Sequence, residues 1–527
     1  MLWIAVHLPQ LSLESFAATV DPAWQGRPLA LIDAHRITQV DASAAALGVQ
    51  PGVKRATALA LARDLVLGEA DAMRDAQALQ AVGHAALAFT PMVCLQAADS
   101  AGTPAPVVLL EVQTCLRCFG GLRRLLQRLR QALQPLGHRC QIATAPTALG
   151  AALLARWRHD LERGAHSSDL TVLRRLLDDA PVWLLGPGRE HWDALQGMGL
   201  KQLADLRHLP RSGLARRFGP ALLADLDRAR GDAPDPREPI VLPQRFEQRI
   251  ELFTRANSAE QLMAGARVLI ARLLAWVHAR HARVAAFTLR MHHETRRGQA
   301  AAHSELTICL AEPSADAAHL QSLLGERLVR SPLAAPALEL SLHCDALVHS
   351  GPPNGELFSS RSSEREGLTR LIERLQARLG AEGVQRVTML ADHRPERATA
   401  WLPADAASLD ARAPIATHPR SAVAPPSLSR AAELTAITQG AATLTRPLWL
   451  LPEPQPLSER GARPWLDGAS LQLLAGPERI ESGWWDGALA ARDYFIARAD
   501  DGALVWIFRA RLPLQERSGW YLQGRFA

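Results

Sequence analysis

The chain of 527 residues is poor in lysine and tyrosine: Lys54 and Lys201 are its only lysines, and it has two tyrosines. Its six cysteines are too few and too scattered to form a disulfide framework at this length. The apolar amino-terminal stretch meets Pro9 too early for a signal peptide or a membrane span, and no other uncharged apolar run is long enough to cross a bilayer. We therefore expect a soluble, cytoplasmic protein.

The composition is that of a globular, basic protein. Hydrophobic residues make up 48% of the chain, and its length allows roughly three to five domains. The formal charge is +6, and almost all of the positive charge is arginine. Arginine suits phosphate contacts and a basic surplus suits nucleic acid. A GC-rich genome also encodes arginine more often than lysine, so composition alone leaves nucleic-acid binding open.

One apolar stretch organises the first part of the chain. Residues 107–112 are apolar except for Glu111, a pattern typical of a short strand buried on both faces. Cys115 and Cys118 follow as a single CxxC pair with no second pair nearby. A zinc or redox site is one interpretation of that pair; packing of both cysteines in the core is the interpretation we favour.

Residues 1–165 alternate strand-like and helix-like segments, which predicts an α/β or α+β layer. Three strings in this region resemble the palm and fingers of Y-family DNA polymerases, with the fingers at about residues 25–75. They are ASAAALGVQPGV at 42–53, LLEV followed by FGG around 109–121, and IATAPTALGAALLAR at 142–156. The resemblance implies an α+β multidomain fold of palm, fingers, thumb and little finger.

Polymerases of this family hold two divalent metals between carboxylates on two neighbouring strands. On the first strand, the Asp-x-Asp positions of the family are occupied here by Ala5, Val6 and His7. On the central strand, the adjacent Asp-Glu positions are occupied by Pro106 and Val107. The resemblance therefore implies a degenerate polymerase with no catalytic residues and no metal cofactor.

Glu111 is a possible replacement ligand on the central strand. Four residues of strand place it roughly 13 Å from Val107, whereas paired catalytic metals lie about 4 Å apart. His7 is a poor ligand for magnesium, which prefers oxygen. An active polymerase with displaced metal ligands nevertheless remains an alternative.

The positions that contact the triphosphate in this family are also changed. The fingers tyrosine and arginine correspond to Ala42 and Ala45. The Asn-Lys pair at the start of the last palm helix corresponds to Thr147-Ala148, and a later lysine to Ala152. The resemblance therefore implies that no nucleotide-binding residue is retained.

Residues 166–232 resemble the thumb of the same family. Gly197 and Gly199 form a Gly-x-Gly turn typical of a helix-hairpin-helix, which presents backbone N–H groups to a phosphate. Lys201, Arg216 and Arg217 add positive charge near the turn. We predict that these five residues contact the DNA backbone, although Gly-x-Gly turns are also common inside helical cores.

A proline-rich linker at 233–246 precedes residues 247–350, whose strands and helices follow the order β-α-β-β-α-β of the little finger. Its sheet would lie in the DNA major groove through backbone contacts that do not read sequence. A folded core with no DNA role is the alternative.

Residues 351–365 carry the turn-forming composition of an exposed segment. Within it, Leu357 and Phe358 resemble the end of the bacterial sliding-clamp pentapeptide, although the opening glutamine is absent. A Leu-Phe pair in a loop can also serve local packing. Residues 366–402 are expected to form a helical extension, and 403–445 a linker.

Residues 446–527 differ from the rest in composition. They hold both tyrosines and tryptophans at 449, 465, 484, 485, 506 and 520. Asp501-Gly502 between two alternating runs predicts a β-hairpin. We expect a small β-rich module that binds a partner or stabilises its own core.

The strings GPERIESGWWDG at 476–487 and RDYF at 492–495 resemble the tail of ImuB-type proteins, and the resemblance covers nearly the whole chain. These are polymerase-like subunits of the bacterial SOS mutagenesis complex that lack polymerase activity. The resemblance implies an adaptor in translesion synthesis that binds DNA, the sliding clamp, a RecA-like partner subunit and an error-prone replicative-type polymerase. A plain interaction protein without a DNA role is a further alternative.

Overall fold

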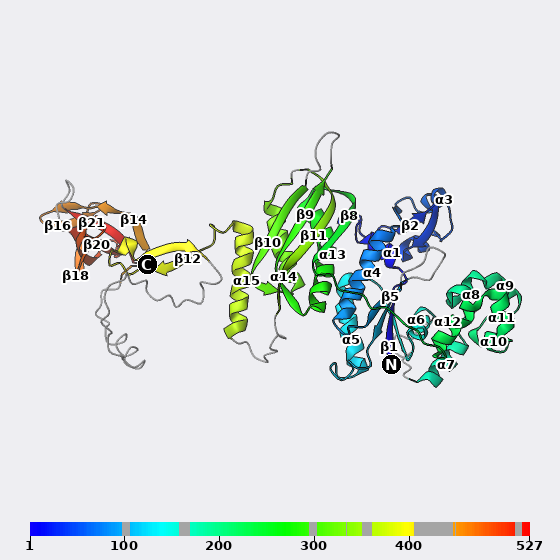
Figure 1. The fold of residues 1–527 in the computed structure, drawn as a ribbon. Helices are drawn as coiled ribbons and strands as arrows, with labels where there is room; N and C mark the ends of the chain where they lie inside the picture. Colours follow the sequence, from blue (N-terminus) through cyan, green and yellow to red (C-terminus); the bar gives the residue numbers. More distant parts are fainter. Residues whose placement is uncertain are drawn as a thin grey trace. The chain divides into compact units, whose positions relative to one another are not determined.

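The computed structural model describes residues 1–96, 106–157, 169–294, 303–333, 335–349, 361–404, 446–447, 449–511 and 519–526 (Figure 1). The chain divides into two compact units, Met1–Arg378 and Leu379–Ala527.

The first unit is built on an antiparallel sheet of four strands in the order β5-β6-β1-β7, which we call the palm-like sheet. Its strands are β1 (Trp3–His7), β5 (Val93–Gln96), β6 (Val107–Glu111) and β7 (Gln141–Ala145). The helices that cover it are α4 (Ala72–Leu87), α5 (Leu122–Leu133) and α6 (Ala148–Trp157). The buried central strand predicted at 107–112 is therefore confirmed as β6.

Successive residues of these strands enter two different cores because side chains alternate across a sheet. Ile4, Val6 and Leu110 pack against α4 and α5 on one face. Ala5 and Leu109 pack toward α6 on the other face.

Cys115 and Cys118 lie in the turns that follow β6. Cys115 is half-buried and Cys118 is exposed, and both are free thiols. The prediction that both cysteines pack in the core is therefore wrong for Cys118, because the chain leaves the sheet in these turns before it enters α5.

A three-stranded sheet in the order β3-β2-β4 occupies the region predicted as fingers. The elements of this region and the segment before it are α1 (Leu11–Ala17), η1 (Pro22–Trp24), β2 (Leu29–Asp33), β3 (Arg36–Val40), α2 (Ala42–Ala46), α3 (Arg55–Leu61) and β4 (Val66–Glu69). The break expected at Gly48 and Gly52 separates α2 from α3. Both glycines have a positive φ, +87° and +89°, which side chains with a Cβ rarely adopt.

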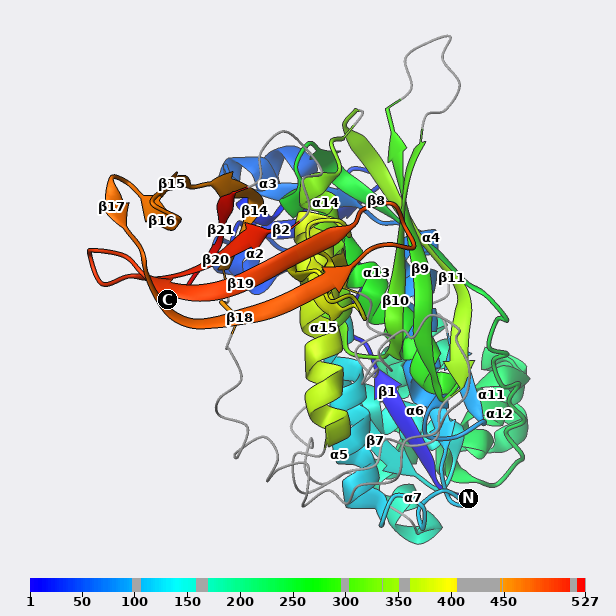
Figure 2. The same cartoon turned by 90° about the vertical axis from the view of Figure 1, so that its left-hand side faces the viewer.

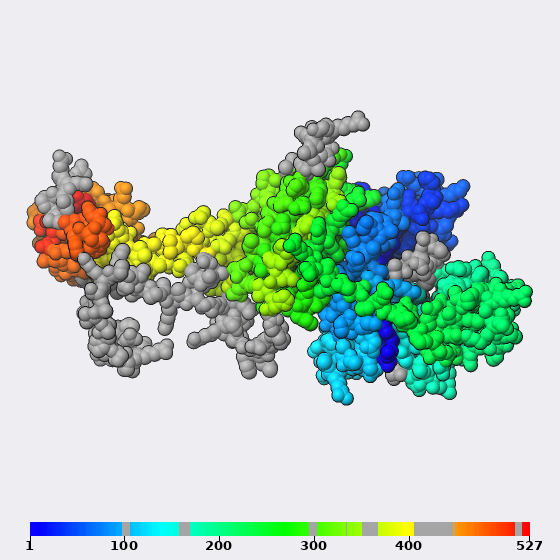
Figure 3. All heavy atoms as spheres, in the orientation of Figure 1, coloured from blue at the N-terminus to red at the C-terminus, as the bar shows by residue number. Residues whose placement is uncertain are grey.

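Residues 170–230 form a group of short helices, the helical lobe, which Figure 3 shows at one side of the unit. They are α7 (Leu170–Asp178), η3 (Val182–Leu184), α8 (Gly186–Glu190), α9 (Trp192–Gly197), α10 (Leu203–Arg207), α11 (Arg211–Phe218) and α12 (Pro220–Arg230). Their leucines share one apolar core with α6 and the palm-like sheet. The lobe therefore belongs to the α6 side of that sheet.

A second antiparallel sheet, in the order β10-β9-β11-β8, completes the first unit with its helices (Figure 2). The elements are β8 (Phe246–Ala256), α13 (Ala259–Ala279), β9 (Ala282–His293), β10 (His303–Ser314), α14 (Ala317–Arg330) and β11 (Ala337–His349). The predicted order β-α-β-β-α-β is observed. The backbone N–H of Phe253 donates to Thr19 O at 3.1 Å, which ties this sheet to the amino-terminal part of the unit.

Helix α13 has the length and mean hydropathy, 1.4, of a membrane-crossing helix, but 67% of that window is buried inside the protein. Leu269, Ile270 and Leu273 are fully buried against the second sheet. Packing in the core therefore accounts for its apolar composition.

Helix α15 (Arg361–Leu379) packs beside α14 and β10. The Glu373 carboxylate lies 2.9 Å from the His319 ring and also accepts the backbone N–H of Ala311. The helical extension predicted for 366–402 is correct only as far as Leu379. The rest forms a hairpin of β12 (Gln385–Met389) and β13 (Thr399–Pro403) around the single turn η4 (Pro395–Arg397).

The second unit is rich in β-structure, as predicted. A five-stranded sheet has the order β14-β21-β20-β19-β18, and a three-stranded sheet has the order β15-β16-β17. The strands are β14 (Trp449–Pro456), β15 (Ser458–Arg460), β16 (Arg463–Leu466), β17 (Ala469–Ser470), β18 (Gln472–Ser482), β19 (Ala490–Arg498), β20 (Leu504–Ala510) and β21 (Trp520–Arg525). The hairpin predicted at Asp501-Gly502 joins β19 to β20, and Gly502 has a φ of +87°. Tyr494 stacks on Trp506 in the core at 4.2 Å between ring centroids.

Candidate nucleic-acid interface

The palm-like sheet brings the two sets of degenerate carboxylate positions together. His7 of β1 lies directly opposite Val107 of β6, and the backbone N–H of Leu8 donates to Pro106 O at 3.0 Å. Ala5 lies further along β1, opposite Leu109. The positions therefore meet at one end of two neighbouring strands, which is the geometry that a shared metal pair would need.

The residues at these positions are buried and, apart from His7, apolar. Val107 and Ala5 are fully buried in the core toward α6, and Pro106 is also buried. The Nδ1 atom of His7 lies 2.8 Å from Gln141 Oε1. Within the ranges that the structure describes, no three His, Cys, Asp or Glu side chains form a group that could hold a metal ion.

Glu111 lies at the other end of β6, opposite Trp3. Its Oε1 atom accepts the backbone N–H groups of Leu2 at 3.3 Å and Gln113 at 3.2 Å. The carboxylate therefore holds the chain at the start of β1 and the end of β6, at the opposite end of the strand from Val107.

The positions that match triphosphate contacts present methyl groups or buried surface. Ala42 and Ala45 are exposed on α2, whereas Ala148 and Ala152 are buried in α6. The first turn of α6 already has an acidic partner from the linker: Asp235 Oδ2 accepts the backbone N–H of Leu149 at 3.1 Å. A phosphate at this helix start would meet a carboxylate.

The predicted Gly-x-Gly turn joins α9 to α10. Gly199 has a φ of +81°, as a tight turn requires. The backbone N–H groups of Lys201 and Gln202 both donate to Asp205 Oδ2 at 2.8 Å, so the amides of these two residues already have an internal acceptor. The side chain of Lys201 is exposed and remains the positive group of this turn.

Most arginines of the helical lobe are neutralised within it. The pairs are Arg174–Asp232, Arg207–Asp178, Arg211–Asp227, Arg228–Asp225 and Arg230–Asp178, with N–O distances of 2.5 to 2.9 Å. Arg216 and Arg217 are exposed near the end of α11 and form no ion pair with another described residue. Lys201, Arg216 and Arg217 are thus the predicted DNA contacts whose charge is available to a ligand.

A second glycine-containing stretch, Gly186-Pro187-Gly188, forms the first turn of α8 and was not singled out from the sequence. An added Cβ at Gly188 would lie 2.1 Å from Val182 O, so the backbone passes too close for any side chain. The Arg189 guanidinium stands 5.6 Å above the Trp183 ring beside this turn. The Gly-Pro-Gly pattern, with proline in the first turn of a helix, was the available signal.

The exposed face of the second sheet is balanced in charge. Arg290 lies 2.7 Å from Glu305, and Arg249 lies 3.8 Å from Glu339. Histidines on three strands also stand beside carboxylates: His292 beside Glu339, His303 beside Glu305 and His343 beside Glu247. The prediction that this sheet enters the major groove gains no support from the charge of this face.

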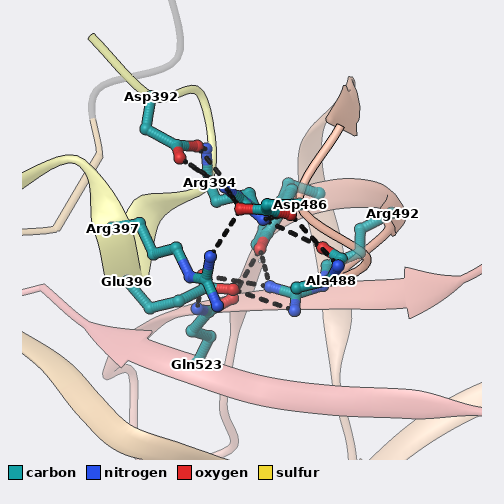
Figure 4. Close-up of polar contacts among 9 residues, drawn as sticks. Asp392, Arg394, Glu396, Arg397, Asp486, Ala488, Arg492 and Gln523 are labelled. Carbon is teal, nitrogen blue, oxygen red and sulfur yellow. Dashed lines mark hydrogen bonds and ion pairs between the residues drawn. The ribbon is translucent and has the colours of Figure 1, made fainter. Parts of the chain in front are cut away.

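A polar cluster in the second unit was also missed (Figure 4). The buried Arg394 donates from Nη2 to Asp392 Oδ2 and to Asp486 Oδ2, both at 2.6 Å. Its Nη1 donates to Asp486 Oδ1 and to Ala488 O, both at 3.0 Å. Hydrogen bonds from Arg394 lower the pKa of Asp486 to about 2.

The loop that Arg394 holds carries two adjacent tryptophans between β18 and β19. Trp484 is 68% exposed and Trp485 is 52% exposed, and their rings meet edge to face at 5.5 Å. An added Cβ at Gly483 would lie 2.4 Å from Arg394 Nη1, so the loop packs directly on the guanidinium. Arg394 therefore presents a fixed aromatic pair to solvent. The two adjacent tryptophans in the sequence were the available signal.

Comparison with known proteins identifies a relative that matches most of the chain. No family model matches the chain. The curated protein ImuB of Caulobacter vibrioides strain NA1000 / CB15N is 27% identical over 490 residues, covering 91% of this chain and 100% of that protein. The same protein from C. vibrioides strain ATCC 19089 matches equally. The chain resembles ImuB. The match to ImuB extends beyond the first unit, and the predicted resemblance to ImuB-type proteins is confirmed.

Solved structures similar to the chain include a ternary complex of Dbh, at 14% identity, 66% of this chain, 100% of that chain and a TM-score of 0.36. DinB from Sulfolobus solfataricus matches at 14% identity over 67% of this chain and 100% of its own, with a TM-score of 0.35. ImuB matches a larger share of the chain than either of these structures.

Proposed function

We propose that the chain is a non-catalytic, polymerase-like DNA-binding protein that acts as an adaptor in translesion synthesis. The observation that carries the proposal is the end of the palm-like sheet, where two strands meet through His7, Pro106 and Val107. Two-metal nucleotidyl transfer needs several carboxylates at one point, whereas His7, Pro106 and Val107 are buried and carry none.

The surroundings of α6 support the same proposal. Where a triphosphate would need cations, Ala148 and Ala152 are buried and the Asp235 carboxylate caps the helix. Asp235 is held in place by Arg237, whose Nε lies 2.9 Å from its Oδ1. An incoming nucleotide would have to displace an internal ion pair before it reached the amides of α6.

The first test is binding of primer–template DNA without extension. We expect the protein to bind the DNA, and we expect no primer extension with magnesium or manganese and all four nucleotides. Changing Lys201, Arg216 and Arg217 together to Gln should weaken binding about tenfold or more and reduce the salt slope by up to ~3, because three phosphate contacts are lost. Fluorescence anisotropy at two salt concentrations measures both quantities.

The matched control removes three arginines whose charge is already paired: Arg207, Arg211 and Arg228, each changed to Gln. It should bind DNA nearly as the wild type does. Extension that disappears in a His7→Ala variant would establish an active polymerase with displaced ligands. Absence of DNA binding at low salt would favour the interaction protein without a DNA role.

The adaptor part of the proposal is supported by the likeness to ImuB over nearly the whole chain. It names as partners the sliding clamp, a RecA-like subunit and an error-prone replicative-type polymerase. Leu357 and Phe358, the predicted clamp contact, lie outside the described residues. A pull-down with the clamp should recover the wild type and lose most of a Leu357→Ala/Phe358→Ala variant, and undiminished recovery would reject this segment as the contact.

A further inference from the structure

Helix α5 lies on the side of the palm-like sheet that faces away from the helical lobe (Figure 1). Its leucines, Leu125, Leu126, Leu129 and Leu133, join Ile4 and Leu110 in the core on that face. The helical lobe joins Ala5 and Leu109 in the core on the opposite face. A ligand held by the lobe is therefore separated from α5 by the thickness of the sheet.

The segment that contains α5 is strongly basic. Residues 112–140 include no aspartate or glutamate. They include the arginines Arg117, Arg123, Arg124, Arg128, Arg130 and Arg139. Because the leucines of α5 fill the core, the polar positions of the helix must face outward. Arg123, Arg124, Gln127 and Arg128 are indeed exposed.

The charge of this face is not cancelled locally. Arg117, Arg123, Arg124 and Arg128 form no ion pair with any carboxylate in the part of the chain that the structure describes. Arg124 and Arg128 are four residues apart on one helix face, so their side chains are neighbours. The guanidinium of Arg128 also stands 5.8 Å from the Phe119 ring centroid, which orients it. This contrasts with the helical lobe, where most arginines pair with carboxylates.

The composition of the face favours nucleic acid over a protein partner. Protein interfaces bury a central apolar patch, often with aromatic side chains. None of the large exposed hydrophobic side chains of the described residues falls between 112 and 140. What remains is a set of planar guanidinium groups with Gln127 and Gln131, a donor-rich surface that matches phosphate oxygens.

We propose that α5 and the turn before it form a second contact for the nucleic-acid backbone, independent of sequence and on the opposite side of the palm-like sheet from the helical lobe. The contact uses Arg117, Arg123, Arg124 and Arg128. A protein with both contacts holds two nucleic-acid segments at once, one on each side of the sheet. The α5 contact goes beyond the proposed function and stands even where the contact in the lobe fails.

The test compares full-length variants in which charge is removed from one side of the sheet at a time. The α5 variant is Arg123→Gln/Arg124→Gln/Arg128→Gln, and the lobe variant is Lys201→Gln/Arg216→Gln/Arg217→Gln. Titration with a short DNA duplex, followed by calorimetry and native mass spectrometry, measures the number of duplexes bound. We expect two for the wild type, one for each variant and none for the combination, with the salt slope of the remaining event unchanged.

The outcomes separate the two ideas. If the α5 variant binds the same number of duplexes as the wild type, with the same affinity and salt slope, the α5 contact is overturned. If only the α5 variant loses binding, the contact proposed in the lobe fails and the α5 contact stands. If polyglutamate binds the wild type as tightly as DNA does, and the α5 variant no longer binds polyglutamate, the face binds an acidic protein and the proposal is overturned. Unchanged thermal unfolding of each variant excludes a folding defect.

Discussion

Val107→Glu is expected to destabilise the first unit by about 3 kcal/mol or more, because it buries an unpaired carboxylate. Val107 is fully buried in the core toward α6, and its neighbours along that face are Ala5 and Leu109. Ala5 and Leu109 cannot donate a hydrogen bond or supply a positive charge. The ring of His7, directly opposite Val107, already has a partner, since its Nδ1 lies 2.8 Å from Gln141 Oε1. Chemical denaturation at neutral pH measures the loss.

The same variant should show a characteristic dependence on pH. Burial raises the pKa of a carboxyl group, so in the folded protein the introduced group binds its proton more tightly than in the unfolded chain. The destabilisation is therefore full above the folded pKa and decreases as the pH falls toward the unfolded value. Unfolding measured at pH 7 and near pH 5 should give a smaller difference from the wild type at the lower pH.

Val107→Gln is the matched control, since glutamine has nearly the same shape as glutamate and no charge. It should lose less stability, and the loss should not change between the two pH values. If Val107→Glu unfolded like the wild type at pH 7, the end of the sheet would be open to water or to an ion. The buried, apolar character on which the non-catalytic proposal rests would then be refuted.

The sequence predicted the elements whose signals are local or strongly periodic. The apolar run at 107–112 identified β6. The resemblance to Y-family polymerases then placed Pro106 and Val107 beside the end of the first strand, β1. The alternation of long strands and helices gave the β-α-β-β-α-β order, and Asp501-Gly502 gave a hairpin. In each case a single strand, helix or turn carries the information.

The sequence could not reveal contacts between distant residues, or backbone N–H groups that an internal carboxylate accepts in place of a ligand. The Gly197-x-Gly199 turn looked able to present its amides, but the Asp205 carboxylate accepts those of the next residues, and only the folded turn reveals this. The hairpin of β12 and β13 lies between Gly383 and Pro403, but no long apolar or alternating run distinguished its two short strands. The Arg394–Asp486 pair joins positions 92 residues apart.

That distant pair gives the last prediction: Arg394→Ala should destabilise the second unit by on the order of 2 to 4 kcal/mol. Arg394 is 2% exposed, and its guanidinium donates to Asp392, Asp486 and the carbonyl of Ala488. Without it, two carboxylates face each other with no shared cation. Unfolding monitored by tryptophan fluorescence should show the loss, because Trp484 and Trp485 lie in the loop that Arg394 holds.

Two further variants and one pH series test the physical cause. Arg397→Ala removes a half-exposed side chain with one bond to Asp486, at 2.7 Å, and should cost less than about 1 kcal/mol. Arg394→Lys keeps the charge without the planar fork. It should still lose most of the stabilisation that Arg394 provides, because a single ammonium group does not reproduce the paired geometry. Since the folded pKa of Asp486, about 2, lies below the ordinary value of 3.8, the contribution is present above 3.8 and is lost as the pH falls toward 2. A wild-type stability for Arg394→Ala, or an equal loss for Arg397→Ala, would show that the loop is held by its backbone rather than by this guanidinium.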